Sequence, residues 1–124
     1  MASKGKGYRT EEHEGFTILV GKGARDNDHL TFAIAEPKDF WLHIAGGTPG
    51  SHVVVKNPDD LPELPRPVER RAAALAAYHS KARNARGKVE VHLCRVADVH
   101  KPRGFAAGKV ALRRWNSLRV YPES

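Results

Sequence analysis

Short runs of apolar and β-branched residues, bounded by glycine, proline or charged residues, indicate the strands of this chain. Residues 16–20 read Phe-Thr-Ile-Leu-Val, and residues 51–55 end in three valines. The predicted strands are residues 16–20, 39–45, 51–55, 88–93 and 118–121, with a weaker candidate at 109–113. Residues 1–12 are polar and rich in glycine and lysine, so we expect a flexible N-terminus before a single domain over residues 13–122.

A short helix is predicted after the glycine-rich turn at residues 21–25, and Pro37 ends it. Its first turn has free backbone N–H groups that a polar side chain can cap. The candidate caps are Asp26, Asn27 and Asp28. The apolar positions that recur at helical spacing are Leu30, Ala33 and Ile34.

The longest helix is predicted from about residue 68 to residue 85, with Pro67 at its start and Gly87 as its C-terminal stop. Its inward-facing residues are Val68, Ala72, Leu75, Ala76 and His79. The elements together predict an α+β fold with one mainly antiparallel or mixed sheet, one long helix and one short helix. The residues expected in its core include Trp41, Leu42, Val53, Val55, Leu75 and Val91.

Charge is distributed unevenly along the 124 residues, whose net charge is +7. Residues 1–65 hold 7 basic and 10 acidic residues, whereas residues 66–124 hold 14 basic and 4 acidic ones. A strongly basic half favours a polyanionic partner, of which nucleic acid is the commonest and an acidic membrane the second. The alternative is that the excess charge serves solubility alone.

Several classes of protein are disfavoured by the composition. The longest apolar runs have about five residues, whereas a membrane-spanning helix needs about 20. No apolar segment follows the basic start of the chain, so a secretory signal is not predicted. Cys94 is the single cysteine, which excludes an intrachain disulfide and a CxxC motif. We therefore expect a soluble cytoplasmic protein that has no contact with membranes.

Candidate catalytic chemistry is sparse. His43 and His52 flank a glycine-rich loop and could form a metal site with Asp39 or Cys94, but their spacing matches no zinc pattern. Hydrogen-bonded structural histidines are the favoured alternative. Arg95 could lower the pKa of Cys94, although a thiol within a predicted strand is more often a small core residue. We expect no catalytic residue, metal or cofactor.

Basic residues interleaved with aromatic ones favour RNA, because cations neutralise phosphates and rings stack on unpaired bases. We expect the anion-binding surface to combine the turn at residues 21–25 with the end of the long helix and a C-terminal loop. The candidate cations are Lys22, Arg25, Lys81, Arg83, Arg86, Lys101 and Arg103. Phe105 and Trp115 lie among such residues and could stack on bases or belong to the core.

Five segments, in order, resemble the NFACT-R family, the RNA-binding module of the NFACT proteins. They are residues 21–31, 39–43 (Asp-Phe-Trp-Leu-His), 49–55 (Pro-Gly-Ser-His-Val-Val-Val), 72–83 and 101–110. The resemblance covers roughly residues 13–122 and departs from the family pattern at Lys22 and Gly23, where Arg and Asn are common. It also suggests that a polar cluster either shapes the fold or faces RNA, and its members are Asp39, Trp41, His43, Ser51 and His52.

The resemblance implies binding of structured tRNA or rRNA. Full-length members act in ribosome quality control on the obstructed large ribosomal subunit with tRNA. Their N-terminal domain and coiled coil are not part of this sequence, so we expect a stand-alone form, for which a link to tRNA 4-thiouridylation with sulfur-carrier partners has been suggested. Two alternatives stay open. One is an RNA-modification enzyme, or a subunit of one, that uses the region of Asp39, His43 and His52. The other is a protein-interaction module on a ribosome-associated partner.

Overall fold

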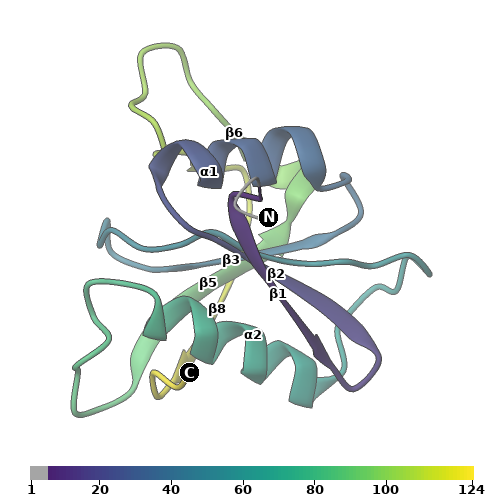
Figure 1. The fold of residues 1–124 in the computed structure, drawn as a ribbon, viewed down its shortest axis with the longest axis vertical. Helices are drawn as coiled ribbons and strands as arrows, with labels where there is room; N and C mark the ends of the chain where they lie inside the picture. Colours follow the sequence, from purple (N-terminus) through teal and green to yellow (C-terminus); the bar gives the residue numbers. More distant parts are fainter. Residues whose placement is uncertain (1–5) are drawn as a thin grey trace.

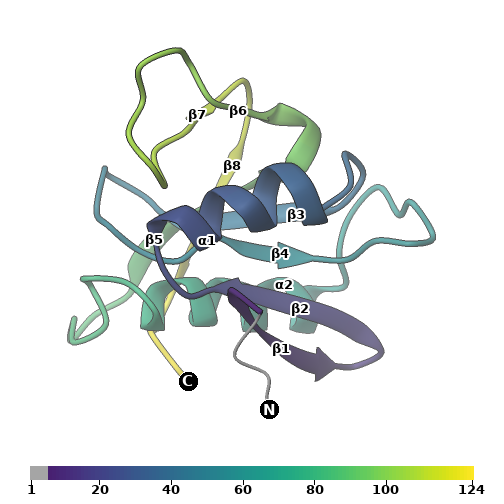
Figure 2. The same cartoon turned by 45° about the horizontal axis from the view of Figure 1, so that its top comes forward.

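The computed structural model describes residues 6–124 and contains one six-stranded antiparallel sheet with a helix on each face (Figures 1 and 2). The strand order in the sheet is β1-β2-β4-β3-β5-β8. These strands are β1 (Tyr8–His13), β2 (Phe16–Gly21), β3 (Phe40–Ile44), β4 (Val53–Val55), β5 (Val89–Arg95) and β8 (Asn116–Val120). The predicted α+β class is therefore confirmed, and the sheet is antiparallel throughout.

The remaining elements cover the faces of the sheet or form a second, two-stranded sheet. Helix α1 (Ala24–His29) continues without a break into the π-helical η1 (Leu30–Ile34), and helix α2 (Arg66–Tyr78) packs on the opposite face. A two-stranded sheet pairs β6 (Val99–His100) with β7 (Ala111–Leu112), and the 3-10 turn η2 (Val96–Asp98) precedes it. Neither helix of residues 6–124 has the length and apolarity that crossing a bilayer requires.

Alternation along the strands produces two cores, because successive side chains point to opposite faces of a sheet. On the α2 face, Ile18, Leu42 and Val53 pack with the small residues of the helix. On the α1 face, Leu19, Trp41 and Val54 pack with Leu30, Cys94, Val96 and Val99. The six predicted core residues are all buried, which confirms that part of the sequence analysis.

Helix α2 is shorter at its C-terminus than predicted. Pro65 is its N-cap residue and Pro67 lies in its first turn, but the helix ends at Tyr78 rather than near residue 85. After Tyr78 the chain pairs with a distant loop: the Ser51 N–H donates to the His79 carbonyl at 2.8 Å, and Lys81 N–H to Pro49 at 2.9 Å. These bonds replace further helical ones, so Gly87 is not the helix stop.

The N-terminal prediction was wrong for residues 8–12, which belong to β1 and pair with β2 along its whole length. A bidentate contact from Arg71 of α2 to the Glu11 carboxylate also holds this edge strand. Lys6 and Gly7 precede it, and residues 1–5 of the predicted flexible segment lie outside the described residues.

The prediction of a side-chain cap for the short helix was also wrong. Gly23 is the N-cap residue and no side chain bonds to the first turn, because Asn27 uses its amide for contacts with another loop. Of the predicted apolar positions Leu30 is buried and Ile34 packs beside it, but Ala33 is exposed.

Candidate nucleic-acid interface

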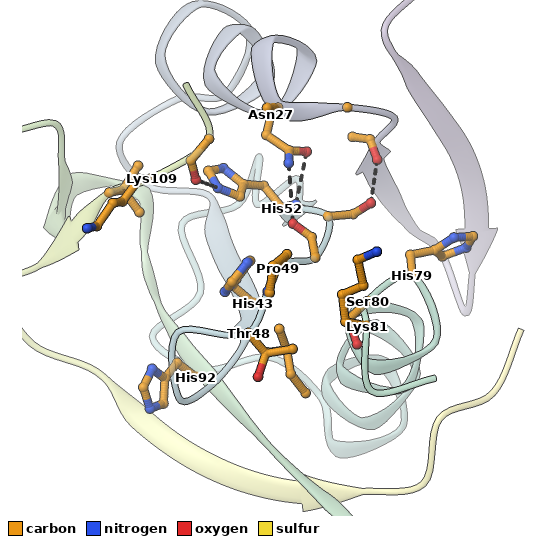
Figure 3. Close-up of a pocket in the computed structure, with 18 of the residues that line it drawn as sticks. Asn27, His43, Thr48, Pro49, His52, His79, Ser80, Lys81, His92 and Lys109 are labelled. Atoms are coloured by element: carbon orange, nitrogen blue, oxygen red, sulfur yellow. Dashed lines mark hydrogen bonds between the residues drawn. The ribbon is translucent and has the colours of Figure 1, made fainter. Parts of the chain in front are cut away.

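An open cleft of about 1020 Å³ lies beside the sheet, where four segments distant in sequence meet (Figure 3). The segments are the turn before α1, the loop at residues 46–52, the C-terminal end of α2 and the loop at residues 107–112. Five cationic side chains line the cleft, and no carboxylate of the described residues does. These cleft cations are Arg9, Lys22, Lys81, Arg83 and Lys109.

The loop at residues 46–52 is fixed from two sides. On one side, Asn27 of α1 accepts a hydrogen bond from the His52 N–H at 3.0 Å and donates one to the Gly50 carbonyl at 3.3 Å. On the other side, Gly50 pairs with Ser80 so closely that a Cβ on Gly50 would lie 2.7 Å from the Ser80 Cβ. Because Gly50 has no side chain, the loop can contact both α1 and the end of α2.

A buried hydrogen-bond network forms the floor at the α1 end of the cleft. The Trp41 indole N–H donates to the Thr31 hydroxyl at 3.2 Å, and that hydroxyl lies 2.8 Å from His52 Nδ1. His52 Nε2 lies 3.0 Å from the Gly108 carbonyl, which can only accept. His52 therefore carries its proton on Nε2, and Thr31 donates to its Nδ1.

Burial lowers the pKa of His52 to about 4, with a smaller contribution from neighbouring His43. Burial likewise lowers the pKa of His43, whose ring stacks on Trp41 with centroids 5.7 Å apart. Both imidazoles are consequently neutral near pH 7 and do not add to the positive charge of the lysines and arginines in the cleft.

The cleft cations are available to a ligand. None of the five forms a salt bridge with any residue in the described part of the chain. Arg83 lies over the Tyr78 ring at 4.2 Å and Lys109 over the Phe105 ring at 5.0 Å, which orients these two side chains without neutralising them.

The structure brings together seven of the twelve predicted RNA-binding residues. The cleft is lined by Lys22, Trp41, His43, Ser51, His52, Lys81 and Arg83. Trp41 and His52 contribute to its floor and are almost inaccessible to solvent. Arg25, Arg86 and Arg103 are exposed but do not line the cleft.

Two predicted contact residues make contacts within the protein and do not line the cleft. Asp39 is fully buried outside the cleft, where its carboxylate accepts bonds from the backbone N–H groups of Glu36 and Asn57 and pairs with Lys56. Lys101 uses its ammonium on Asp28 at 3.0 Å and on the carbonyls of Ala106 and Lys109. Both side chains are therefore engaged in contacts within the protein.

Among the basic and histidine side chains that line the cleft, four were absent from the predicted site: Arg9, His79, His92 and Lys109. Arg9 belongs to the strand that the sequence analysis missed, and His79 was assigned to the buried stripe of the long helix. His92 is the register partner of His43 on the neighbouring strand, a relation that only strand pairing reveals. Lys109 was part of the basic C-terminal region, so its charge was the one available signal.

Cys94 is a core residue, and Arg95 does not activate it. Burial raises the pKa of its thiol to about 12, with Asp98 adding to the effect. The Arg95 guanidinium lies elsewhere, over the Phe40 ring and on the carbonyls of Lys38 and Leu61. Within residues 6–124, no three His, Cys, Asp or Glu side chains are grouped so that they could hold a metal ion.

Several known proteins are similar to this chain in sequence and in fold. The family model described as NFACT protein RNA binding domain matches residues 6–114. The chain is 43% identical over 105 residues to a protein named Rqc2 homolog RqcH from Streptococcus suis, and 38% identical over 116 residues to one from Bacillus subtilis. These alignments cover 85% and 92% of this chain but only 18% and 19% of the relatives, so the chain spans about a fifth of their length.

A solved structure extends the match to three dimensions. It is the C-terminal part of the fibronectin/fibrinogen-binding protein from Streptococcus suis, with a TM-score of 0.84 and 38% sequence identity over 98% of this chain and 47% of that one. The resemblance seen in the sequence is thereby confirmed. Because this family model matches residues 6–114 of the 124, which include all four segments of the cleft, this protein belongs to the NFACT-R family, the RNA-binding domain of NFACT proteins.

Proposed function

We propose that this domain binds structured RNA, tRNA or rRNA, by contacts between the cleft cations and RNA phosphates. The observation that carries the proposal is the cleft lining, with five unpaired cations and no carboxylate among the described residues. Membership of the NFACT-R family supports RNA as the polyanion.

The spread of the cations over the fold suits a nucleic-acid backbone better than a small anion. Arg9 comes from β1, Lys22 from the turn before α1, and Lys109 from the loop before β7. Lys81 and Arg83 follow α2. Several separated phosphate contacts fix the register of an RNA, whereas a single turn could hold only one phosphate.

The cellular setting that we propose is ribosome quality control, on a large ribosomal subunit that carries tRNA. It is supported by the RqcH relatives, of which this chain matches less than a fifth. These relatives do not support the predicted link to tRNA 4-thiouridylation or to sulfur-carrier partners, and no catalytic role is assigned to the cleft.

Two matched double variants test the proposal. Lys22→Ala/Arg83→Ala removes two cleft cations, and Arg25→Ala/Arg86→Ala removes two exposed cations nearby that do not line the cleft. At low salt, the first should weaken tRNA binding roughly tenfold, as expected for two exposed contacts of about 0.7 kcal/mol each, and the second should leave it unchanged. Equal affinity of the cleft variant and the parent would refute the proposed surface, and binding of a ribosomal protein without RNA would favour the interaction-module alternative.

A further inference from the structure

The α1 face of the sheet is open over part of β5 and β8. Helix α1 contacts β2, and the region of β6 and β7 covers the end of β5 around Cys94. Beyond these covered parts, His92 is only half-buried and Ser117 and Arg119 of β8 are exposed. A surface of side chains therefore continues from the cleft, which His92 lines, to the edge strand of the sheet.

Three ring-bearing side chains lie next to one another across the strands of this surface. His43 and His92 are register partners on β3 and β5, so their side chains are neighbours on the same face. The His92 ring lies 5.2 Å from the indole of Trp115, which precedes β8 and is 48% exposed. We call His43, His92 and Trp115 the aromatic row, and Figure 3 shows its first two members at the cleft.

We propose that the aromatic row stacks unpaired bases of the RNA whose phosphates the cleft cations hold. The inference rests on the proposed function and names its substrate class: a single-stranded segment, such as a loop or an end. Planar rings bind base faces with little regard to sequence, and those faces are accessible only where the RNA is not a helix.

The exposure of Trp115 supports a role in binding. A large aromatic side chain is usually buried for stability, and the other tryptophan of the chain, Trp41, is only 2% exposed. Trp115 instead contacts a half-buried imidazole at the edge of the sheet and leaves much of its surface to solvent.

The charges around the row are compatible with RNA. Glu90 is the carboxylate beside it, 3.6 Å from His92 Nε2, and it accepts a hydrogen bond from the Ser117 hydroxyl at 2.7 Å. Its register partner across the strands is Arg119, so a cationic residue lies beside it on the same face. The RNA backbone would therefore run toward the cleft cations, with bases rather than phosphates over His92.

The test compares a fluorescein-labelled oligouridylate of about 12 nucleotides with an RNA duplex of similar length. Trp115→Ala should weaken binding of the single strand about tenfold and leave its salt dependence unchanged, because a stacking contact and no phosphate contact is lost. Trp115→Tyr should restore most of the affinity. Phe32→Ala is the matched control, since Phe32 is 45% exposed and does not line the cleft.

Tryptophan fluorescence supplies a second readout. The oligouridylate should quench the emission of the parent but not that of Trp115→Tyr, because buried Trp41 cannot meet a base. Parent-like single-strand affinity of Trp115→Ala, or an equal loss for the duplex, would overturn this inference while the proposed function stood. Failure of the parent to bind either RNA would overturn both.

Discussion

Acidification should destabilise this domain through His52, a fully buried imidazole that the fold holds in its neutral form. Its pKa is about 4 in the folded state and about 6.5 in an unfolded chain, so the unfolded state binds the proton first as the pH falls. The stabilisation from neutral His52 is therefore complete above about pH 6.5 and is lost as the pH falls from there to about 4. Between about pH 7.5, above this window, and about pH 5, within it, linkage gives a loss of about 2 kcal/mol in the free energy of unfolding.

Urea unfolding of the parent and of His52→Gln at these two pH values measures this effect. Carboxylates titrate in both proteins, so the difference between their pH dependences isolates the imidazole. We expect the parent to lose about 2 kcal/mol more than the variant on acidification. If both lose the same free energy of unfolding, His52 does not have the depressed pKa that the Thr31–His52–Gly108 network requires.

Two further predictions concern the core on the α1 face. Trp41→Ala removes a buried ring and its hydrogen bond to Thr31, and should cost about 3–5 kcal/mol in urea unfolding, whereas a cost below about 1 kcal/mol would contradict the packing described. Cys94 should resist alkylation by iodoacetamide near pH 8 in the folded protein, because burial raises its pKa to about 12, and should react once urea unfolds the chain. Mass spectrometry measures the extent of alkylation. Fast alkylation without urea would show that the thiolate is accessible and would contradict this prediction.

The strands that short apolar and β-branched runs predicted are present because one or both of their faces are buried. The prediction at residues 16–20 corresponds to β2, which extends one residue further, to Gly21. The prediction at residues 51–55 contains β4, which begins at Val53. Strand β1 was missed because its residues are mostly polar, and a distant partner, Arg71, holds it at the sheet edge. The excess predicted length of α2 has the same origin, since the pairing of Ser80 with Gly50 replaces local helical bonds with a contact 30 residues away in sequence.

The candidate site was predicted in part. The loop at residues 46–52 and its flanking histidines were recognised, as were Lys22 and the basic residues after α2. Asp39 was grouped with His43 because they are close in sequence, but four residue steps along an extended chain place them about 13 Å apart. Cross-strand neighbours such as His92 could not be recognised before the register of β3 and β5 was known.

The salt dependence of tRNA binding tests most directly whether the cleft cations contact RNA phosphates. With five such contacts, log K should fall against log salt with a slope of about −4.5, which corresponds to about 500-fold between 50 and 200 mM. Lys22→Ala/Arg83→Ala should reduce the slope to about −2.7, and Arg25→Ala/Arg86→Ala should keep the parent's value. Parallel lines for the parent and the cleft variant would contradict the account, because the removed cations would then have released no counterions.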